Sequence, residues 1–164
     1  MYYIGWYASP VGQITLLSDG GALLGLWLEG QANFGCNQLA EAVENEALPL
    51  FDQVRRWLDD YFLGLCPDPA GVPLSPMGTA FQKRVWQALL AVPYDSTATY
   101  GDIARQIGRP RAFQAVGSAV GRNPISIIIP CHRIVGSQGQ LTGYAGGLER
   151  KQWLLRHESS SGKS

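Results

Sequence analysis

The first third of the chain alternates apolar and polar residues in a way that predicts short β-strands. Residues 2–7 and 13–18 flank a turn at residues 9–12, and a glycine-containing turn at residues 19–21 leads into residues 22–28. Runs of this kind joined by short turns form hairpins or meanders. A small antiparallel sheet is therefore expected at the N-terminus.

A helical pattern follows this sheet. Apolar residues recur at helical spacing behind Pro49, and a proline is favoured in the first turn of a helix. These residues are Leu50, Val54, Trp57, Leu58 and Tyr61. The next stretch, residues 66–76, is rich in proline and indicates a loop. We place a domain boundary there, with an N-terminal α/β structural domain at residues 1–75, a C-terminal domain at 76–158 and a disordered tail at 159–164.

The C-terminal half begins with two capped helices. Thr79 and Gln82 form a capping box for a helix that stops at Pro93, and Thr99 with Asp102 repeats the pattern for a shorter one. The apolar residues of these helices are Phe81, Val85, Trp86, Leu89 and Leu90 in the first, and Ile103 and Ile107 in the second.

A turn at residues 108–110 leads into a third helix, which ends near Gly121. Its inward residues are expected to be Phe113, Val116 and Val120. Two short helices joined by a glycine-containing turn are typical of the helix-turn-helix motif, although helix pairs that only pack share the pattern. The exposed side would carry Arg111, Gln114, Ala115, Ser118 and Ala119. Small residues there permit close approach to a narrow groove or a backbone.

The net charge is zero but unevenly distributed. Residues 1–75 carry nine acidic and two basic side chains, whereas residues 76–164 carry four acidic and eleven basic ones. Five arginines fall between residues 103 and 148, a stretch without any acidic residue. This asymmetry indicates that the C-terminal half meets a polyanion.

Composition argues against several classes of protein. No apolar run approaches the roughly 18 residues of a membrane-spanning helix, and the N-terminus lacks the pattern of a signal peptide. Three cysteines, an odd number, argue against a disulfide framework, and two histidines offer no zinc-ligand spacing. We expect a cytoplasmic protein without a metal site.

The tetrapeptide Pro130-Cys131-His132-Arg133 carries the clearest chemistry. It follows the apolar run 125–129, which predicts a short buried strand. A thiol is only slightly ionised at neutral pH and the thiolate is the nucleophile, so the chemistry requires a neighbouring base. A buried cysteine beside a surface histidine has the same pattern. Cys36 and Cys66 are interpreted as structural or incidental rather than reactive.

The order of the C-terminal motifs resembles that of the O6-alkylguanine-DNA alkyltransferases, also called methylated-DNA–protein-cysteine methyltransferases. The motifs are Tyr100, the helix-turn-helix, Gly121-Arg122-Asn123-Pro124, the cysteine tetrapeptide, Gly143-Tyr144-Ala145-Gly146-Gly147 and residues 151–158. The resemblance covers nearly all of residues 79–158. It implies an α+β fold, in which a small antiparallel sheet plus a helix precedes a mostly helical, winged-helix-like domain carrying the active-site cysteine.

The resemblance implies five catalytic residues. Cys131 is the alkyl acceptor, His132 takes the thiol proton through a water molecule, and Glu158 holds the imidazole in the required tautomer. Tyr100 donates to guanine N3, which improves the leaving group. Asn123 is the hinge residue before the active-site segment, and its side chain fixes the turn that carries Cys131.

The resemblance also implies contacts to the damaged base. Tyr144 and the backbone N–H of Ala145 line the base pocket and meet guanine O6. The backbone carbonyls of Cys131 and Ile134 accept from the exocyclic amine of guanine.

One position departs from the family. Where the family usually has an arginine that enters the base stack, this chain has Gln114. Extruding a base costs a few kcal/mol, so a shorter, uncharged side chain predicts slower flipping, with Arg111 or Arg122 compensating. Ala115 and Ser118 are the small residues expected to face the minor groove.

The expected function is direct-reversal DNA repair. One alkyl group passes from O6-alkylguanine, or from O4-alkylthymine, in double-stranded DNA to Cys131. The scheme needs no cofactor, and the monomeric protein is consumed because no residue is placed to break the thioether.

Three alternatives come from other classes. A non-catalytic damage-recognition protein on the same scaffold would lack the acceptor cysteine. A transcriptional regulator would show base-reading side chains and a dimerisation element. A thiol redox protein would need a resolving cysteine near Cys131.

Overall fold

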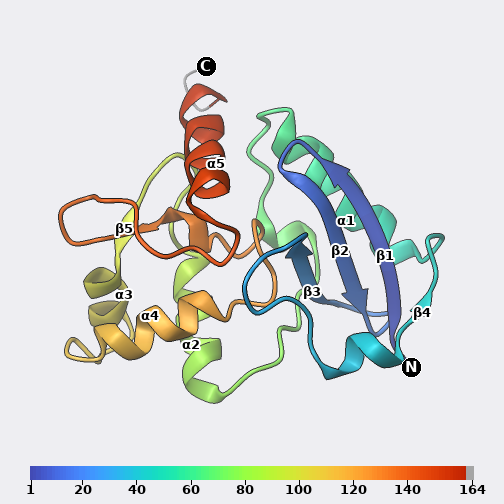
Figure 1. Cartoon of the computed structure of the whole chain (residues 1–164), viewed down its shortest axis with the longest axis horizontal. Helices are drawn as coiled ribbons and strands as arrows, with labels where there is room; N and C mark the ends of the chain where they lie inside the picture. Colours follow the sequence, from blue (N-terminus) through green and yellow to red (C-terminus); the bar gives the residue numbers. More distant parts are fainter. Residues whose placement is uncertain (162–164) are drawn as a thin grey trace.

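The computed structural model describes residues 1–161, which form an α+β fold. The N-terminal sheet and α1 lie on one side of the molecule, and α3, α4 and α5 lie toward the other (Figure 1). The elements are β1 (Tyr3–Ser9), β2 (Gly12–Ser18), β3 (Leu23–Leu28), η1 (Asn37–Glu41), β4 (Val43–Glu44), α1 (Pro49–Phe62), η2 (Pro69–Gly71), α2 (Ala80–Leu89), β5 (Ala98–Thr99), α3 (Tyr100–Gln106), α4 (Phe113–Gly121), η3 (Cys131–Arg133), β6 (Ile134–Val135) and α5 (Leu148–Ser161).

The N-terminal sheet is built on the predicted hairpin. β1 pairs antiparallel with β2 from Tyr3–Ser18 to Ser9–Gly12, and β2 pairs antiparallel with β3. The short β4 adds in parallel to β1, so the strand order is β3-β2-β1-β4. The helix α1 packs on this sheet. Gly5 allows its close approach, because a Cβ there would lie 2.8 Å from the ring of Phe51.

The C-terminal helices begin where their caps predict. The hydroxyl of Thr79 accepts from the Gln82 N–H at 3.1 Å, and that of Thr99 accepts from the Asp102 N–H at 3.0 Å. Gly108, with a φ of 76°, makes the turn between α3 and α4. The helices α2, α3 and α4 pack on one another as the expected helix-turn-helix unit.

Residues 125–129 do not form the predicted strand. Only Ile125 makes a β-bridge, to Leu26, and Ile127 then adopts a φ of 70°. The side chain of Asn123 explains the difference, because it bonds the backbone N–H and C=O of Ile125 and the C=O of Ile129. These bonds satisfy polar groups that a strand would offer to a neighbour. The segment is nevertheless buried, as predicted.

The packing face of α4 differs from the prediction at two positions. Ala119, expected on the exposed side, is only 2% exposed because it shares the inner face with Val116 and Val120. Phe113, expected to pack inward, is 53% exposed. As the first residue of α4, it lines a surface cavity together with Tyr100.

The C-terminal helix extends further than predicted. Residues 159–161, assigned above to a disordered tail, belong to α5. The remaining residues of that tail, 162–164, lie outside the described part of the chain. Within residues 1–161, no helix is both long and apolar enough to cross a membrane.

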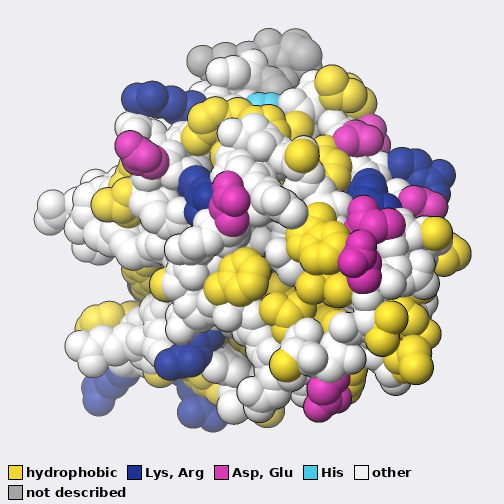
Figure 2. Space-filling model, turned by 45° about the vertical axis from the view of Figure 1, so that its right-hand side comes forward, with side chains coloured by type: hydrophobic (Ala, Val, Ile, Leu, Met, Phe, Trp, Pro, Cys, Tyr) yellow, Lys and Arg dark blue, Asp and Glu magenta, His cyan; other side chains and the backbone are white. Residues whose placement is uncertain are grey.

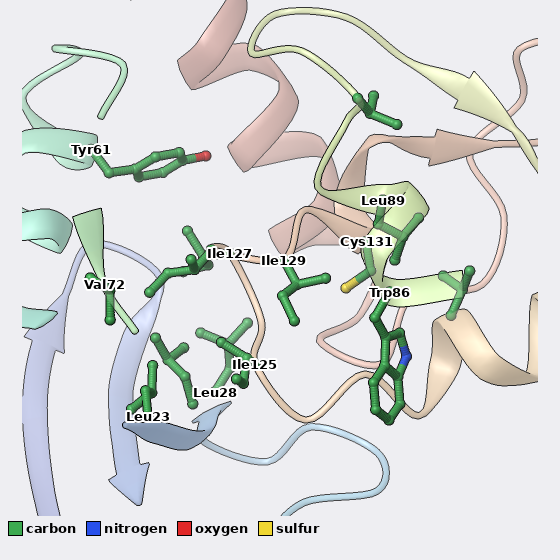
Figure 3. Close-up of a cluster of buried hydrophobic side chains, with 14 of the residues drawn as sticks. Leu23, Leu28, Tyr61, Val72, Trp86, Leu89, Ile125, Ile127, Ile129 and Cys131 are labelled. Atoms are coloured by element: carbon green, nitrogen blue, oxygen red, sulfur yellow. The ribbon is translucent and has the colours of Figure 1, made fainter. Parts of the chain in front are cut away.

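One hydrophobic core continues across the predicted domain boundary. Figure 3 shows Leu23, Leu28 and Val72 of the N-terminal half beside Ile125 and Ile127 of the C-terminal half. The same cluster extends through Ile129, Trp86 and Leu89 to Cys131. The candidate nucleophile therefore lies at the edge of the main core.

Candidate active site

Cys131 is the first residue of the short helix η3 and is buried. Its backbone N–H donates to the Ile129 carbonyl at 2.8 Å, and its side chain packs in the core with 4% exposure. Burial raises the pKa of the thiol, and the nearby Asn123 and Lys151 offset only part of this effect. A buried thiol of this kind is protonated at neutral pH, so its reaction as a nucleophile requires a base.

His132 and Glu158 form the pair that the resemblance implies, although 26 residues separate them. The Nε2 atom of His132 lies 2.6 Å from Oε2 of Glu158, and both side chains are fully buried. Burial lowers the pKa of His132, despite the opposing hydrogen bond and charge of Glu158. The imidazole is therefore neutral near pH 7, as a general base must be.

Glu158 is surrounded by hydrogen-bond donors. Besides His132, it accepts from the Arg133 guanidinium at 2.8 and 3.1 Å, from the Tyr61 hydroxyl at 2.7 Å and from the Asp95 N–H at 3.2 Å. Burial alone would raise the pKa of this carboxyl. The hydrogen bonds from His132 and Arg133 and the positive charge of Arg133 lower it to about 2. Glu158 is therefore a carboxylate, which can only accept hydrogen bonds.

The charge of Glu158 determines the tautomer of His132. Since a carboxylate cannot donate, the proton of the neutral imidazole lies on Nε2, and Nδ1 carries a free lone pair. The Nδ1 atom is buried and has no hydrogen-bond partner among the described residues. Of the two ring nitrogens, Nδ1 is therefore the one that can take a proton.

Arg133 anchors this site. In addition to its bonds to Glu158, its guanidinium donates to the Val92 carbonyl at 2.8 Å and lies 5.5 Å from the centroid of the Tyr94 ring. Because His132 and Arg133 are adjacent and both bind Glu158, two of the three residues of the Cys131–Arg133 turn are held to α5.

Tyr100 and the loop at residues 143–147 lie side by side. Tyr100 begins α3, directly after the Thr99 cap, and a Cβ on Gly143 would lie 3.9 Å from its hydroxyl oxygen. The ring of Tyr144 folds over Gly146, where a Cβ would lie 2.5 Å from the ring. Burial raises the pKa of Tyr144 well above its usual value, and its hydroxyl has no hydrogen-bond partner in the described part of the chain. The structure thus brings Tyr100 next to the loop that carries Tyr144 and Ala145.

The predicted backbone acceptors for guanine already make bonds within the protein. The Cys131 carbonyl accepts from the Ile134 N–H, and the Ile134 carbonyl accepts from Lys151 Nζ. Each carbonyl oxygen has a second lone pair, so both remain able to accept from a base. The Ala145 carbonyl accepts from the Ala32 N–H at 2.8 Å, which ties the pocket loop to the N-terminal half.

The predicted DNA-contacting residues share one surface. Arg111, Gln114, Ala115, Ser118 and Arg122 are all exposed, on α4 or next to its ends. The helix lies at the lower left of the molecule in Figure 1, and basic side chains gather at the lower left of the face in Figure 2. This surface has the charge and the small side chains that close approach to a polyanion requires.

The sequence analysis missed two buried residues at this site. Lys151 is fully buried, and its ammonium group donates to the carbonyls of Thr142 (2.7 Å) and Ile134. Burial lowers the pKa of Lys151 to about 8. Tyr61 reaches Glu158 from the N-terminal half. The helical spacing predicted that Tyr61 packs inward, but no local pattern indicates which polar group a buried side chain meets.

A metal centre finds no support in residues 1–161. These residues contain no group of three or more histidine, cysteine, aspartate or glutamate side chains arranged to hold an ion. Cys36, Cys66 and Cys131 are free thiols.

Two family models match consecutive parts of the chain. Residues 1–76 match the 6-O-methylguanine DNA methyltransferase ribonuclease-like domain, and residues 80–160 match the DNA binding domain of the same family. A methylated-DNA–protein-cysteine methyltransferase of Haemophilus influenzae is 45% identical over 158 residues, which span 96% of this chain and 86% of the relative. The chain belongs to the 6-O-methylguanine DNA methyltransferase family.

Other members of the methyltransferase family agree with this assignment. A relative from Methanosarcina acetivorans is 45% identical over 98% of this chain and 99% of its own length. The crystal structure of Mycobacterium tuberculosis OGT in complex with DNA is 42% identical, covers 97% of this chain and 94% of that chain, and has a TM-score of 0.89. These matches extend over both halves, including the N-terminal half, which lies outside the resemblance found at residues 79–158.

Proposed function

We propose that this protein repairs alkylated DNA by direct reversal, as a methylated-DNA–protein-cysteine methyltransferase that acts once. The observation that carries the proposal is the buried, hydrogen-bonded pair of His132 and Glu158 that directly follows the buried Cys131. A buried thiol lies next to a neutral imidazole, which an ionised Glu158 holds with Nδ1 free to accept a proton. Nucleophile, base and orienting carboxylate follow the logic of a catalytic triad.

The reaction conserves atoms and charge without a cofactor. The Nδ1 atom of His132 takes the thiol proton through a water molecule, and the Cys131 thiolate attacks the alkyl carbon on guanine O6. The carbon–oxygen bond breaks as the carbon–sulfur bond forms, and the electron pair leaves with guanine. A hydrogen bond from Tyr100 to guanine N3 stabilises this anion. The thioether product is stable, so each molecule reacts once.

The damaged base is held by the loop that follows β6. Tyr144 lies against the base, the Ala145 N–H donates to O6, and the free lone pairs of the Cys131 and Ile134 carbonyls accept from the exocyclic amine. Asn123 positions the nucleophile indirectly, because its side chain fixes the backbone of residues 125–129 just before Cys131.

The minor groove of double-stranded DNA docks on α4. Ala115 and Ser118 allow close approach, while Arg111 and Arg122 contact phosphates and Gln114 lies where the base leaves the stack. We further propose that the protein acts as a monomer in the cytoplasm, where its three free cysteines stay reduced. O4-alkylthymine is a second candidate substrate.

Intact-protein mass spectrometry tests this function. The protein is mixed with a duplex containing one O6-methylguanine, and a Cys131→Ser variant serves as the control. A mass gain of one methylene on the Cys131 peptide, absent from the variant, is expected. Tight binding to the damaged duplex without a mass change would instead identify a non-catalytic damage-recognition protein.

A further inference from the structure

The N-terminal half contributes a side chain to the active site of the C-terminal half. Tyr61, on α1, is fully buried, and its hydroxyl donates to Oε2 of Glu158 at 2.7 Å. This is the same oxygen that pairs with His132 at 2.6 Å. Figure 3 shows the Tyr61 ring reaching out from α1 with its oxygen directed toward the ribbon of α5. Tyr61 and His132 are therefore linked through one carboxylate oxygen.

Aromatic neighbours fix the direction of this hydroxyl. The ring of Tyr61 stacks on Trp57 at a centroid distance of 5.7 Å and an interplanar angle of 9°. Phe62 and Tyr94 meet it edge-on, at 5.1 and 6.1 Å, and His157 lies 5.3 Å away. A ring enclosed in this way loses little further conformational freedom when it donates, so its hydrogen bond is preorganised.

The hydrogen bond from Tyr61 also affects the negative charge on the Glu158 oxygen that contacts His132. Because Glu158 is an ionised carboxylate, Tyr61 must be the donor, and it draws negative charge toward itself from Oε2. Less charge then remains on that oxygen to retain a proton on the imidazole. The bond thus both orients the carboxylate and keeps His132 neutral.

We propose that Tyr61 is a positioning residue of the alkyl transfer, through which the N-terminal half sets the orientation and the base strength of His132. This inference rests on the proposed function, because it concerns the same reaction at Cys131. It assigns the N-terminal half a part in the chemistry beyond supporting the fold.

A matched pair of variants tests the inference. Tyr61→Phe removes only the hydroxyl, and Tyr7→Phe removes a similar hydroxyl, which donates to Asp59 of the same helix α1 at 2.6 Å but lies away from Glu158. We expect the single-turnover rate of alkyl transfer to fall about tenfold in Tyr61→Phe, the usual effect of losing a hydrogen bond to a charged group. The rate of Tyr7→Phe and the affinity of both variants for the damaged duplex should not change.

The pH profile of the transfer rate separates positioning from a merely structural effect. The ionisable groups around His132 are Glu158, Arg133, Lys151 and Cys131, and Tyr94 and His157 also face Tyr61. None of them changes in Tyr61→Phe. With more charge left on Glu158, His132 should hold a proton to higher pH, so the acid side of the profile should move upward. A structural loss would lower the rate equally at every pH.

The outcomes distinguish this inference from the proposed function. If the unchanged protein transfers no alkyl group, the proposed function fails. If it transfers the group, and Tyr61→Phe does so at the same rate with the same acid side, the inference about Tyr61 is wrong. Should Tyr61→Phe not fold, 3-fluorotyrosine placed at residue 61 retains the ring and strengthens the donor. It should move the acid side to lower pH, and an unchanged profile would overturn the inference.

Discussion

At the scale of single residues, the reactivity of Cys131 depends on groups that never touch the alkyl group. Burial makes its thiol a weaker acid, so the proton must go to His132. His132 is a suitable base because Glu158 fixes its tautomer, and Glu158 is ionised because several donors surround it. The reactivity of the Cys131 sulfur thus depends on the Glu158 carboxylate, which acts on it only through His132.

Replacing that carboxylate should affect activity and stability together. In Glu158→Gln, we expect transfer to slow at least about 100-fold, because the orienting charge is lost. The buried Arg133 also loses its counter-ion, which should cost about 3–5 kcal/mol of unfolding free energy. Glu149→Gln, an exposed change on the same helix, is the control. Single-turnover kinetics and thermal unfolding measure the two effects. A near-normal transfer rate in Glu158→Gln would contradict the proposed role of Glu158 in orienting His132.

The lowered pKa values of His132 and Glu158 predict that the folded protein loses stability in acid. The pKa of His132 is lowered from 6.5, and that of Glu158 is lowered from 4.5 to about 2, so the unfolded chain binds more protons than the folded one below these values. The free energy of unfolding should therefore decrease below about pH 6.5 and more steeply below about pH 4.5. By pH 3, Glu158 accounts for about 2 kcal/mol of this loss. Urea unfolding between pH 3 and 8 measures it. In Glu158→Gln the decrease below about pH 4.5 should be smaller by this amount, and an undiminished decrease would contradict its assignment to Glu158.

The sequence identified some of these residues as site residues and missed others. The pair Cys131–His132 is adjacent, so the tetrapeptide indicated a nucleophile and a base, but only the family resemblance excluded a buried cysteine beside a surface histidine. Glu158 was identified only through the family resemblance, because spacing cannot pair residues 26 positions apart. Lys151 and Tyr61 were missed since their polar partners come from other elements. What such side chains do depends on tertiary packing, which a single sequence does not show.

At the scale of elements, two similar helix caps offer a controlled comparison. Thr79 and Thr99 each complete a capping box, but only Thr99 is followed directly by a candidate catalytic residue, Tyr100. Thr79→Ala and Thr99→Ala should each cost about 1 kcal/mol of stability. Only Thr99→Ala should also slow transfer, because fraying of α3 displaces Tyr100. Equal rates in the two variants, measured in single turnover, would show that this cap does not position Tyr100.

A substitution on α4, the helix proposed to dock on DNA, should give a gain of function. Gln114 is exposed, so Gln114→Arg should leave the unfolding free energy within about 0.5 kcal/mol of its original value. On damaged duplex DNA, the arginine should raise the transfer rate roughly tenfold by stabilising the stack after the base leaves. With free O6-methylguanine as substrate the rate should not change, because nothing is extruded. A similar gain on the free base would place the effect in the pocket instead.

Element prediction succeeded where the signals were local. Capping residues and helical spacing correctly predicted α1, α2 and α3. The strand predicted for residues 125–129 was wrong, because the Asn123 side chain forms hydrogen bonds with the backbone of Ile125 and Ile129. A strand pattern takes no account of such a side chain. The prediction that Phe113 packs inward was wrong, because the helical period alone does not show that the first turn of α4 faces a surface cavity.

At the scale of the whole molecule, the two halves share one core. The main cluster of buried side chains runs from the sheet through Ile125 to Cys131. We therefore expect one cooperative thermal transition, with equal calorimetric and van't Hoff enthalpies. Two separate transitions in a calorimetric scan would mean that the halves fold as independent units.

The uneven distribution of charge has a consequence for how the protein meets DNA. With an excess of seven acidic side chains in residues 1–75 and of seven basic ones in residues 76–164, the molecule is an electric dipole without a net charge. A phosphate duplex exerts a torque on such a dipole, which turns the basic half, and with it α4, toward the DNA before contact. Because the net charge is zero, the long-range attraction of the whole molecule to DNA is weak. Rotational alignment combined with weak long-range attraction suits a protein that must inspect many base pairs to find one lesion.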